Sequence, residues 1–242
     1  MAAIKINGLT KVYKDVVAVD NLNLDIYEGE LLSLLGVNGA GKTTTIKMLS
    51  CLTVPTKGDA ILLGKSIVSN TLDVKSLIAV SPQETAVAPN LTAKENLELI
   101  CGVHGFSNDK KVAKINEITS LLSLKDILSK KAGKLSGGWQ RRLSIAMALI
   151  SEPKILFLDE PTLGLDVLAR SELWDLIKLL KGKITIILTT HYMEEAEELS
   201  DRIAIMKDGK LLLVDTPSNI KEQTNTDSIE KAFISIVKGV TK

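Results

Sequence analysis

The sequence has few features that would place the chain inside a membrane or mark it for secretion. Its apolar runs, such as residues 31–37 and 184–188, are far shorter than the roughly 18–20 residues needed to span a bilayer. The N-terminal segment has no apolar stretch typical of a signal peptide. The two cysteines, Cys51 and Cys101, are too few for a disulfide framework and fall in stretches that predict helix. We therefore expect no transmembrane segment, no signal peptide and two buried thiols.

The sequence also has no excess of charge of either sign. The 30 basic and 29 acidic residues give a formal net charge of +1. The longest basic clusters are pairs, such as Lys130–Lys131 and Arg141–Arg142, so no basic patch suggests a nucleic-acid partner. With 45% hydrophobic and 24% charged residues, the composition is ordinary for a globular protein of this length. Hence we expect one substantial core and no nucleic-acid binding.

Apolar runs alternate with helical patterns along much of the chain, an order that predicts a largely parallel sheet. Continuous apolar strands indicate that helices cover both faces of this sheet. Strands are expected at residues 30–36, 154–159, 183–190 and 202–207. Helices are expected at residues 42–52, 167–181 and 192–199. The helix at 167–181 should bury one face, made of Leu168, Trp174, Ile177 and Leu180.

Other regions depart from this pattern. Short alternating segments before residue 30 and a hairpin-like segment at 58–67 predict a small antiparallel layer. Residues 92–150 show only helical patterns, and residues 226–239 predict a last amphipathic helix. The sequence thus predicts a single domain over residues 1–242. Its parts are a core with an N-terminal β layer (about 1–85 and 151–214), a helical insert (about 86–150) and a helical tail (about 215–242).

The segment GVNGAGKT, residues 36–43, fits the pattern G-x-x-x-x-G-K-[ST] between a predicted strand and a predicted helix. That context predicts a loop whose backbone N–H groups cradle phosphates at a helix start. Glycines let the backbone approach the phosphate oxygens, Lys42 neutralises the terminal phosphates, and the Thr43 hydroxyl is placed for Mg²⁺. The residues expected to bind nucleotide here are Gly36, Val37, Asn38, Gly39, Ala40, Gly41, Lys42, Thr43 and Thr44.

The segment ILFLDE, residues 155–160, places two acids where a buried strand ends. Ligands of open parallel sheets bind at the carboxyl ends of the strands. Asp159 is therefore expected to hold Mg²⁺, and Glu160 to orient and deprotonate an attacking water as general base. Adjacent strand residues point to opposite faces, so both acids reach one site only if the strand ends there, as Pro161 indicates.

A second turn suited to anions is LSGG, residues 135–138, which runs directly into a predicted helix. The Ser136 hydroxyl and the glycine N–H groups would be donors at the helix start. A phosphate cradle followed by LSGG, then by LDEPT and a lone histidine after a strand, resembles the ATPase subunit of ATP-binding-cassette (ABC) transporters. The resemblance implies a P-loop NTPase fold of the ABC ATPase type, with a mainly parallel α/β core sheet, an antiparallel β subdomain and an inserted helical subdomain. It also implies ATP hydrolysis with Mg²⁺.

In that family two subunits pack head to tail. The resemblance therefore implies that Ser136, Gly137 and Gly138 contact the γ-phosphate held by the cradle of a second subunit. Asp166, in the segment LGLD, would then contact that subunit across the interface.

Three further positions match the family individually. Tyr13 matches the aromatic residue that stacks on adenine, and Gln83 matches the glutamine that binds Mg²⁺ and contacts the helical lobe. His191 matches the histidine that contacts the γ-phosphate, so that Lys42, Glu160 and His191 form the expected catalytic group. The acidic run at residues 194–198 is expected to be a solvated helix face.

One departure from the family pattern is Trp139, which stands where the signature usually has glutamine, with Gln140 following it. Ser136 and both glycines are retained, so the phosphate contacts should be retained as well. The indole of Trp139 could pack on the ATP ribose or on the opposite subunit, or it could be an ordinary buried helix-face residue.

The resemblance also implies partners. These are a second ABC ATPase subunit, in a homodimer or heterodimer, and integral-membrane permease subunits, with this chain peripheral on the cytoplasmic face of the membrane. The amino-acid sequences of residues 43–58 and 191–210 are similar to those of the subgroup that exports drugs and antibiotics. The alternative is a soluble ABC ATPase that acts on ribosomes or nucleic acid. Against it, the chain has no sustained heptad repeat and no basic patch.

Overall fold

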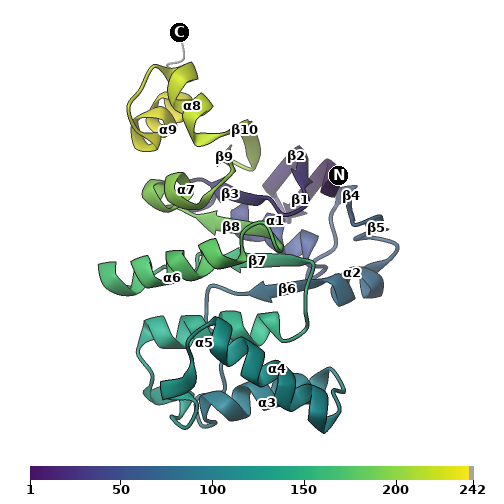
Figure 1. Ribbon diagram of the computed structural model, residues 1–242. Helices are drawn as coiled ribbons and strands as arrows, with labels where there is room; N and C mark the ends of the chain where they lie inside the picture. The colour runs from purple at the N-terminus through teal and green to yellow at the C-terminus, as the bar shows by residue number, and fades with distance from the viewer. Residues whose placement is uncertain (240–242) are drawn as a thin grey trace.

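The computed structural model describes residues 1–239, whose strands form two sheets (Figure 1). The larger sheet has the strand order β10-β9-β3-β8-β7-β6, and all neighbours pair in parallel except β10 and β9. Its strands are β3 (Leu31–Leu35), β6 (Ile78–Ser81), β7 (Ile155–Asp159), β8 (Thr185–Thr190), β9 (Arg202–Lys207) and β10 (Lys210–Asp215). The prediction of a mainly parallel core sheet is therefore confirmed.

The sequence analysis predicted neither of the two edge strands, β6 and β10. Strand β6 has four residues and follows helix α2 (Thr71–Leu77) without an intervening turn, so no local signal separates the two. Strand β10 pairs with β9 through Asp208 and Gly209, which both have positive φ, at 48° and 78°. Such a two-residue turn favours a hairpin. Both strands are short or half-exposed, as edge strands usually are.

The smaller sheet is antiparallel, in the order β2-β1-β4-β5, as the alternating N-terminal pattern predicted. Its strands are β1 (Ala2–Tyr13), β2 (Val16–Tyr27), β4 (Lys57–Leu62) and β5 (Lys65–Ser66). Helix α1 (Lys42–Leu49) packs with both sheets, since its Ile46 and Met48 share one apolar cluster with Ile26 of β2 and Phe157 of β7. This cluster holds α1 against both sheets.

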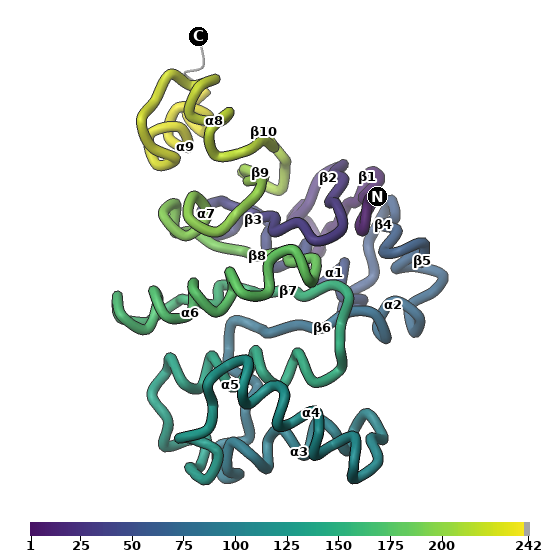
Figure 2. The backbone as a smooth tube through the Cα atoms, viewed as in Figure 1, coloured from purple at the N-terminus to yellow at the C-terminus, as the bar shows by residue number. Residues whose placement is uncertain are grey.

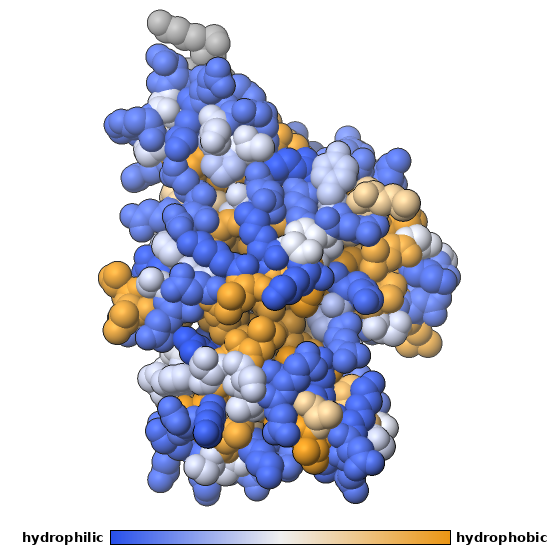
Figure 3. Space-filling view, in the orientation of Figure 1, coloured by the Kyte–Doolittle hydropathy of each residue, from blue (hydrophilic) through white to orange (hydrophobic). Residues whose placement is uncertain are grey.

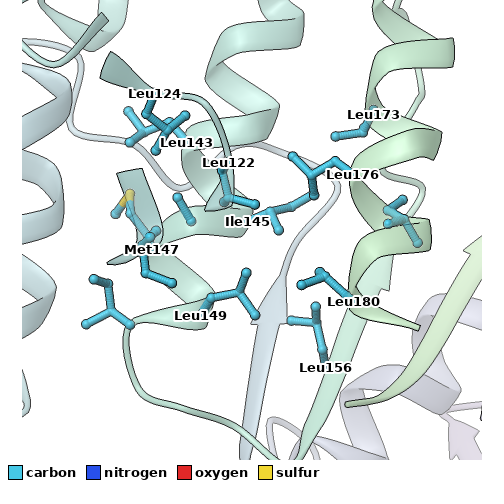
Figure 4. Close-up of a cluster of buried hydrophobic side chains, with 14 of the residues drawn as sticks. Leu122, Leu124, Leu143, Ile145, Met147, Leu149, Leu156, Leu173, Leu176 and Leu180 are labelled. Carbon is cyan, nitrogen blue, oxygen red and sulfur yellow. The ribbon is translucent and has the colours of Figure 1, made fainter. Parts of the chain in front are cut away.

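The chain between β6 and β7 forms the helical insert, seen at the bottom of Figure 1. It contains α3 (Ala93–Val103), α4 (Asn108–Leu121), two short 3₁₀ turns and α5 (Gly137–Leu149). The insert shares one buried cluster with the core: Leu143 and Ile145 of α5 belong to it together with Leu156 of β7 and Leu176 of α6 (Val167–Leu180), and Figure 4 shows Ile145 next to Leu176. We propose this insert as a subdomain covering about residues 86–150.

The remaining helices lie after β7 in the chain. They are α6 (Val167–Leu180), α7 (Met193–Leu199), α8 (Pro217–Thr224) and α9 (Ile229–Lys238). Figure 2 shows α8 and α9 at the end of the molecule opposite the insert. There Ile220 of α8 and Phe233 of α9 pack against Ile205 of β9. Residues 240–242, at the end of the predicted tail, lie outside the described residues.

Two details of the predicted helices are wrong. Leu168 is 71% exposed rather than buried, because the first turn of α6 faces solvent and its apolar face starts only at Leu173. Helix α1 ends at Leu49, so Cys51 lies in the following turn and is half-buried, whereas Cys101 is buried as expected. Both corrections concern helix ends, because the spacing of apolar residues indicates a helix better than it indicates where the helix begins or ends.

Within residues 1–239, none of the helices combines the length and the apolar character needed to cross a bilayer. In Figure 3, apolar surface is exposed where the helical insert meets the sheet layer, while the C-terminal helices are covered mainly by hydrophilic residues. The exposed face of the molecule is therefore uneven in polarity, with its apolar area next to the junction of insert and core.

Candidate active site

A cavity of about 730 Å³ opens where the parallel strands β3, β7 and β8 end. Its lining residues are Val16, Val17, Ala18, Asn38, Gly39, Ala40, Gly41, Lys42, Thr43, Thr44, Gln83, Glu160, Leu163, His191 and Asp208. The fold thus brings together the phosphate loop, the predicted general base and the predicted histidine, from segments far apart in the sequence. The carboxyl edge of a parallel sheet is the expected place for a ligand site.

The glycines of the phosphate loop are required for different reasons. A Cβ on Gly36 would lie 2.6 Å from the Met206 carbonyl oxygen, and one on Gly41 would lie 2.5 Å from that of Ala18. These two glycines therefore allow the loop to pack against its neighbouring strands. Gly39 has a φ of 84° and nothing within 4 Å of its Cβ position, so it leaves the loop open on the cavity side. From the sequence, Gly41 was expected only to let the backbone approach the phosphate oxygens.

Lys42, the first residue of α1, holds a buried positive charge at the cavity. Its Nζ donates hydrogen bonds to the carbonyl oxygens of Gly36 (2.8 Å) and Val37 (3.3 Å). It also lies 3.6 Å from Glu160 Oε1. Burial lowers the pKa of Lys42, while the negative charges of Glu160 and Asp159 oppose this shift. The ammonium is therefore surrounded by acceptors and directed at the place where phosphates would bind.

Asp159 lies behind Thr43 rather than on the cavity wall, and it is 5% exposed. Its Oδ1 accepts hydrogen bonds from the hydroxyls of Thr43 (3.1 Å) and Thr189. A carboxylate next to a hydroxyl provides the hard oxygen ligands that Mg²⁺ prefers, and Mg²⁺ takes its other ligands from water and phosphates. The residues present therefore fit the metal that the sequence predicted.

Glu160 reaches the same edge because the backbone turns there. Strand β7 ends at Asp159, and Glu160 has a φ of 47°, in the left-handed region. Its N–H donates hydrogen bonds to the carbonyl oxygen (3.1 Å) and the hydroxyl (3.0 Å) of Thr189 on β8. The expectation that the strand ends between the two acids is confirmed. The reversal directs the Glu160 side chain toward the cavity, beside Lys42.

His191 follows the last residue of β8 and lies next to Glu160. Its Nδ1 is 3.2 Å from Glu160 Oε2, and its ring centroid is 4.2 Å from that of Tyr192. The Glu160 carboxylate thus has an ammonium on one side and an imidazole on the other. Such an arrangement can hold a carboxylate in place to accept a proton from water.

Gln83 lines the cavity from the loop after β6, and Arg141 of α5 holds that loop. The Arg141 guanidinium donates hydrogen bonds to the carbonyl oxygens of Pro82 and Gln83. Burial lowers the pKa of Arg141, and the negative charges of Asp159 and Glu195 oppose this shift. The loop that carries Gln83 is therefore linked to the helical insert through its backbone carbonyl groups, which contact α5, the helix that begins with the LSGG turn. The sequence analysis considered Arg141 only as part of a basic pair.

The LSGG turn is at the start of α5 and is not part of the cavity. Ser136 is the N-cap residue, but its side chain makes no capping hydrogen bond, and both Ser136 and Gly137 are exposed. Gly138 allows close packing, since a Cβ there would lie 3.0 Å from the Ala169 Cβ of α6. The first turn of α5 therefore presents donors that no capping side chain in this chain satisfies.

Trp139 has packing partners within the chain, as the helix-face alternative predicts. It is half-buried against the apolar cluster of the insert, and the Arg142 guanidinium lies 4.6 Å from its ring centroid. Arg142 also forms an ion pair with Glu172 of α6 at 3.1 Å. The neighbouring Gln140 donates a hydrogen bond to the Ala132 carbonyl oxygen at 3.0 Å. Trp139 and Gln140 therefore both help to hold α5 in place.

Two residues assigned by resemblance lie outside the cavity wall. Tyr13 ends β1 opposite Val16 and is 43% exposed, with the Lys11 Nζ 5.0 Å from its ring centroid. Asp166 is exposed and caps α6 by accepting a hydrogen bond from the Ala169 N–H at 2.9 Å. The adenine contact of Tyr13 and the interface contact of Asp166 stay predictions.

The prediction that residues 194–198 form a solvated face is wrong for Glu195. This residue is 0% exposed, because it lies on the face of α7 that also buries Ala196 and Leu199. Its Oε1 accepts a hydrogen bond from Trp174 Nε1 at 3.1 Å, and burial raises the pKa of its carboxyl group. Only the three-dimensional packing of α7 on α6 distinguishes this glutamate from its neighbours.

Comparison with known proteins agrees with this site. Residues 19–163 match the family described as ABC transporter. The chain is 43% identical over 215 residues to the human phospholipid-transporting ATPase ABCA3, covering 87% of this chain but only 13% of the relative. It is 38% identical over 229 residues to the daunorubicin resistance ATP-binding protein DrrA3 of Streptomyces coeruleorubidus, covering 94% of this chain and 72% of the relative.

A solved structure has the same fold. It is a dimer of the ATP-binding cassette MJ0796 in a post-hydrolysis state bound to ADP and Pi, and it matches with a TM-score of 0.78 at 29% identity. The match covers 88% of this chain and 98% of that one. The family match, the identity to DrrA3 over most of both chains and the shared fold thus agree with one another. The protein belongs to the ABC transporter family, in which it is an ATP-binding cassette of the ATPase fold.

Proposed function

We propose that the protein hydrolyses ATP with Mg²⁺, as one of two cassettes in a dimer, to drive export through membrane permease subunits. The observation that supports this most directly is the placement of Glu160 between Lys42 and His191 at the cavity. A general base held next to a phosphate-binding lysine is the arrangement that phosphoryl transfer to water requires.

In this reaction the phosphates of ATP lie against the N–H groups of residues 38–44, and Lys42 compensates the charge of the terminal phosphates. Glu160 accepts a proton from the attacking water, and His191 holds the carboxylate in position. Thr43, Asp159 and Gln83 would hold Mg²⁺, which supplies charge neutralisation at the phosphates when bound. Burial around Lys42 and Glu160 strengthens these electrostatic contacts.

The exposed turn of α5 supports the proposed dimer. Ser136, Gly137 and Gly138 do not line the cavity of their own chain, and Ser136 and Gly137 are exposed. In a head-to-tail dimer they would meet the γ-phosphate held by the other subunit, and Asp166 would lie in the interface. The second subunit is an identical or a homologous cassette. Contacts that depend on the γ-phosphate make the closed dimer stable only before hydrolysis.

The membrane partner and the direction of transport are inferred from the relatives. One relative is named for phospholipid transport and another for daunorubicin resistance. We infer that this chain likewise works on the cytoplasmic face of a membrane, together with permease subunits that move an apolar or amphipathic compound outward.

The test is the variant Glu160→Gln, compared with Glu222→Gln on the exposed surface of α8. Phosphate release should fall by roughly 10²- to 10⁴-fold in E160Q, because the general base is lost, and stay unchanged in E222Q. With ATP and Mg²⁺, E160Q should elute as a dimer on size-exclusion chromatography. Undiminished phosphate release, or a monomer under these conditions, would contradict the proposal. Co-purification with detergent-solubilised membrane subunits rather than with ribosomes or nucleic acid tests the transport role.

A further inference from the structure

A buried polar cluster lies next to the segments that hold the two catalytic side chains. It consists of Glu195 on α7, Trp174 and Arg170 on α6, Thr190 and Thr162, and we call it the anchor cluster. Thr190 directly precedes His191 in the chain, and Thr162 follows Glu160 by two residues. The cluster therefore connects α6 to α7, directly after the turn that contains His191, and lies beside the segment that contains Glu160.

Glu195 is the centre of this cluster. Its Oε1 accepts a hydrogen bond from Trp174 Nε1 at 3.1 Å, and no part of the residue is exposed. The hydroxyls of Thr190 and Thr162 and the charge of Arg170 lie near enough to favour its ionised form. Burying a carboxylate is unfavourable, and an apolar side chain of similar size would often be at least as stable here. Packing alone therefore does not explain a glutamate at this position.

A second contact joins α6 to the turn that contains His191. The Arg170 guanidinium lies 4.6 Å from the ring centroid of Tyr192, and Tyr192 packs on the His191 ring at 4.2 Å between centroids. The Tyr192 N–H donates a hydrogen bond to the Thr190 hydroxyl at 2.9 Å. The turn around His191 is thus held from α6 at two points, by Arg170 on one side and by Trp174 through Glu195 on the other.

We propose that Glu195 is a positioning residue for ATP hydrolysis, which fixes the turn containing His191 against α6 through its hydrogen bond to Trp174. The imidazole then stays within 3.2 Å of Glu160, where it can hold the general base. This role rests on the ATPase function proposed above. It also means that a displacement of α6, whose N-cap residue is Asp166, changes the position of His191.

The proposal predicts a specific kinetic effect of Glu195→Leu, which keeps the volume but removes the acceptor. The kcat for ATP hydrolysis should fall by about tenfold or more, since small displacements of catalytic groups have effects of this size. The KM for ATP should change by less than about twofold, because the phosphate loop is not touched. Trp174→Phe removes the donor, so it should likewise lower kcat and leave KM nearly unchanged.

Two further variants separate positioning from a general structural role. Glu195→Gln retains an oxygen that can accept from Trp174 and should recover much of the lost kcat. The double variant E195L/W174F should be no slower than either single variant, because both remove the same contact. The matched control is Glu198→Leu on the same helix, whose carboxylate pairs with Lys178 of α6 at the surface. It should leave kcat unchanged.

The outcomes are distinguishable. If folded E195L and W174F retain the kcat of the wild type, the positioning role is refuted, although the ATPase function stands. If E195L does not fold, W174F decides, because it removes the same contact at a half-buried position while retaining an aromatic ring. If wild-type protein with ATP and Mg²⁺ releases no phosphate, the proposed function itself fails.

Discussion

Two helix starts in this molecule are suited to phosphate, and they differ in what surrounds them. The start of α1 is enclosed by groups of the same chain, with Lys42, Glu160 and His191 at one cavity. The start of α5 is exposed, and its N-cap residue, Ser136, makes no capping hydrogen bond. The first site has charged groups for binding and catalysis within one chain. The second has donors only, so in the proposed dimer it would act on a ligand held by the other subunit.

The largest effect should come from breaking the first site. Lys42→Ala removes the only cation of the chain that lines the cavity among the described residues, so ATP hydrolysis should fall at least about 10³-fold. Lys47→Ala, on the exposed side of the same helix, should leave it unchanged. Phosphate release at saturating ATP measures both. A K42A variant with more than about a tenth of wild-type activity would show that the loop's backbone alone is sufficient.

Mixing two inactive variants should test whether the second site acts on another chain. Lys42→Ala disables the phosphate loop, and Ser136→Arg blocks the LSGG turn, so each variant alone should be inactive. In a mixed dimer of two copies, one composite site has an intact cradle from one subunit and an intact turn from the other. Phosphate release should therefore rise upon mixing to roughly a quarter of the wild-type rate, for random pairing and one active site in two. No rise above the separate variants would argue against composite sites.

Two glycine substitutions should show that Gly36 and Gly39 contribute differently to the stability of the phosphate loop. Gly36→Ala places a Cβ 2.6 Å from the Met206 carbonyl oxygen, which is backbone and cannot move aside. We expect a loss of roughly 1–3 kcal/mol in the free energy of unfolding. Gly39→Ala has open space around its Cβ and a strained φ of 84°, so its loss should be nearer 1 kcal/mol. Urea denaturation of both variants checks the order, and the reverse order would refute this account of the loop.

The smallest expected effect is on the pH dependence of the free energy of unfolding. Burial raises the pKa of Glu195 above its ordinary value of 4.5, so the folded state binds this proton more tightly than the unfolded state does. The resulting contribution to stability is complete below pH 4.5 and is lost as the pH rises through the raised pKa. Glu195→Gln removes this dependence. The stability of E195Q relative to wild type should therefore increase by roughly 1 kcal/mol between about pH 5 and pH 8, as urea denaturation can measure.

Arg170 and Arg141 both carry positive charges that act on Glu195, and they partly stabilise its ionised form. Lys178→Gln, at the exposed end of the α6–α7 contact, is a control that should leave the pH dependence of stability intact. A difference between E195Q and wild type that does not vary with pH would show that the Glu195 carboxyl group does not titrate in this range.

The residues of the reactive site could be predicted because each belongs to a short motif at the end of a strand. Lys42, Glu160 and His191 lie in different segments, yet the carboxyl ends of parallel strands meet at one edge and bring them together. The mainly parallel sheet followed from continuous apolar runs. The edge strands β6 and β10 were missed, since a short strand next to a helix has no pattern of its own.

Arg141 and Glu195 could not be predicted in the same way. Each is a charged residue beside other charged residues in the sequence, which is the ordinary pattern of a solvated helix face. Their burial depends on which side of the helix meets another element, and their partners are carbonyl oxygens and an indole distant in the sequence. Contacts of this kind are set by tertiary packing and have no local signature.

The left-handed backbone at Glu160 sets stability against activity at a single residue. A glutamate with a φ of 47° is disfavoured by about 1 kcal/mol or more relative to glycine, which adopts this conformation freely. Exchanging Glu160 for glycine should therefore stabilise the fold by about 1 kcal/mol, but it would remove the carboxylate that the proposed hydrolysis needs. A more heat-resistant form of this fold and an active one would thus require different residues at position 160.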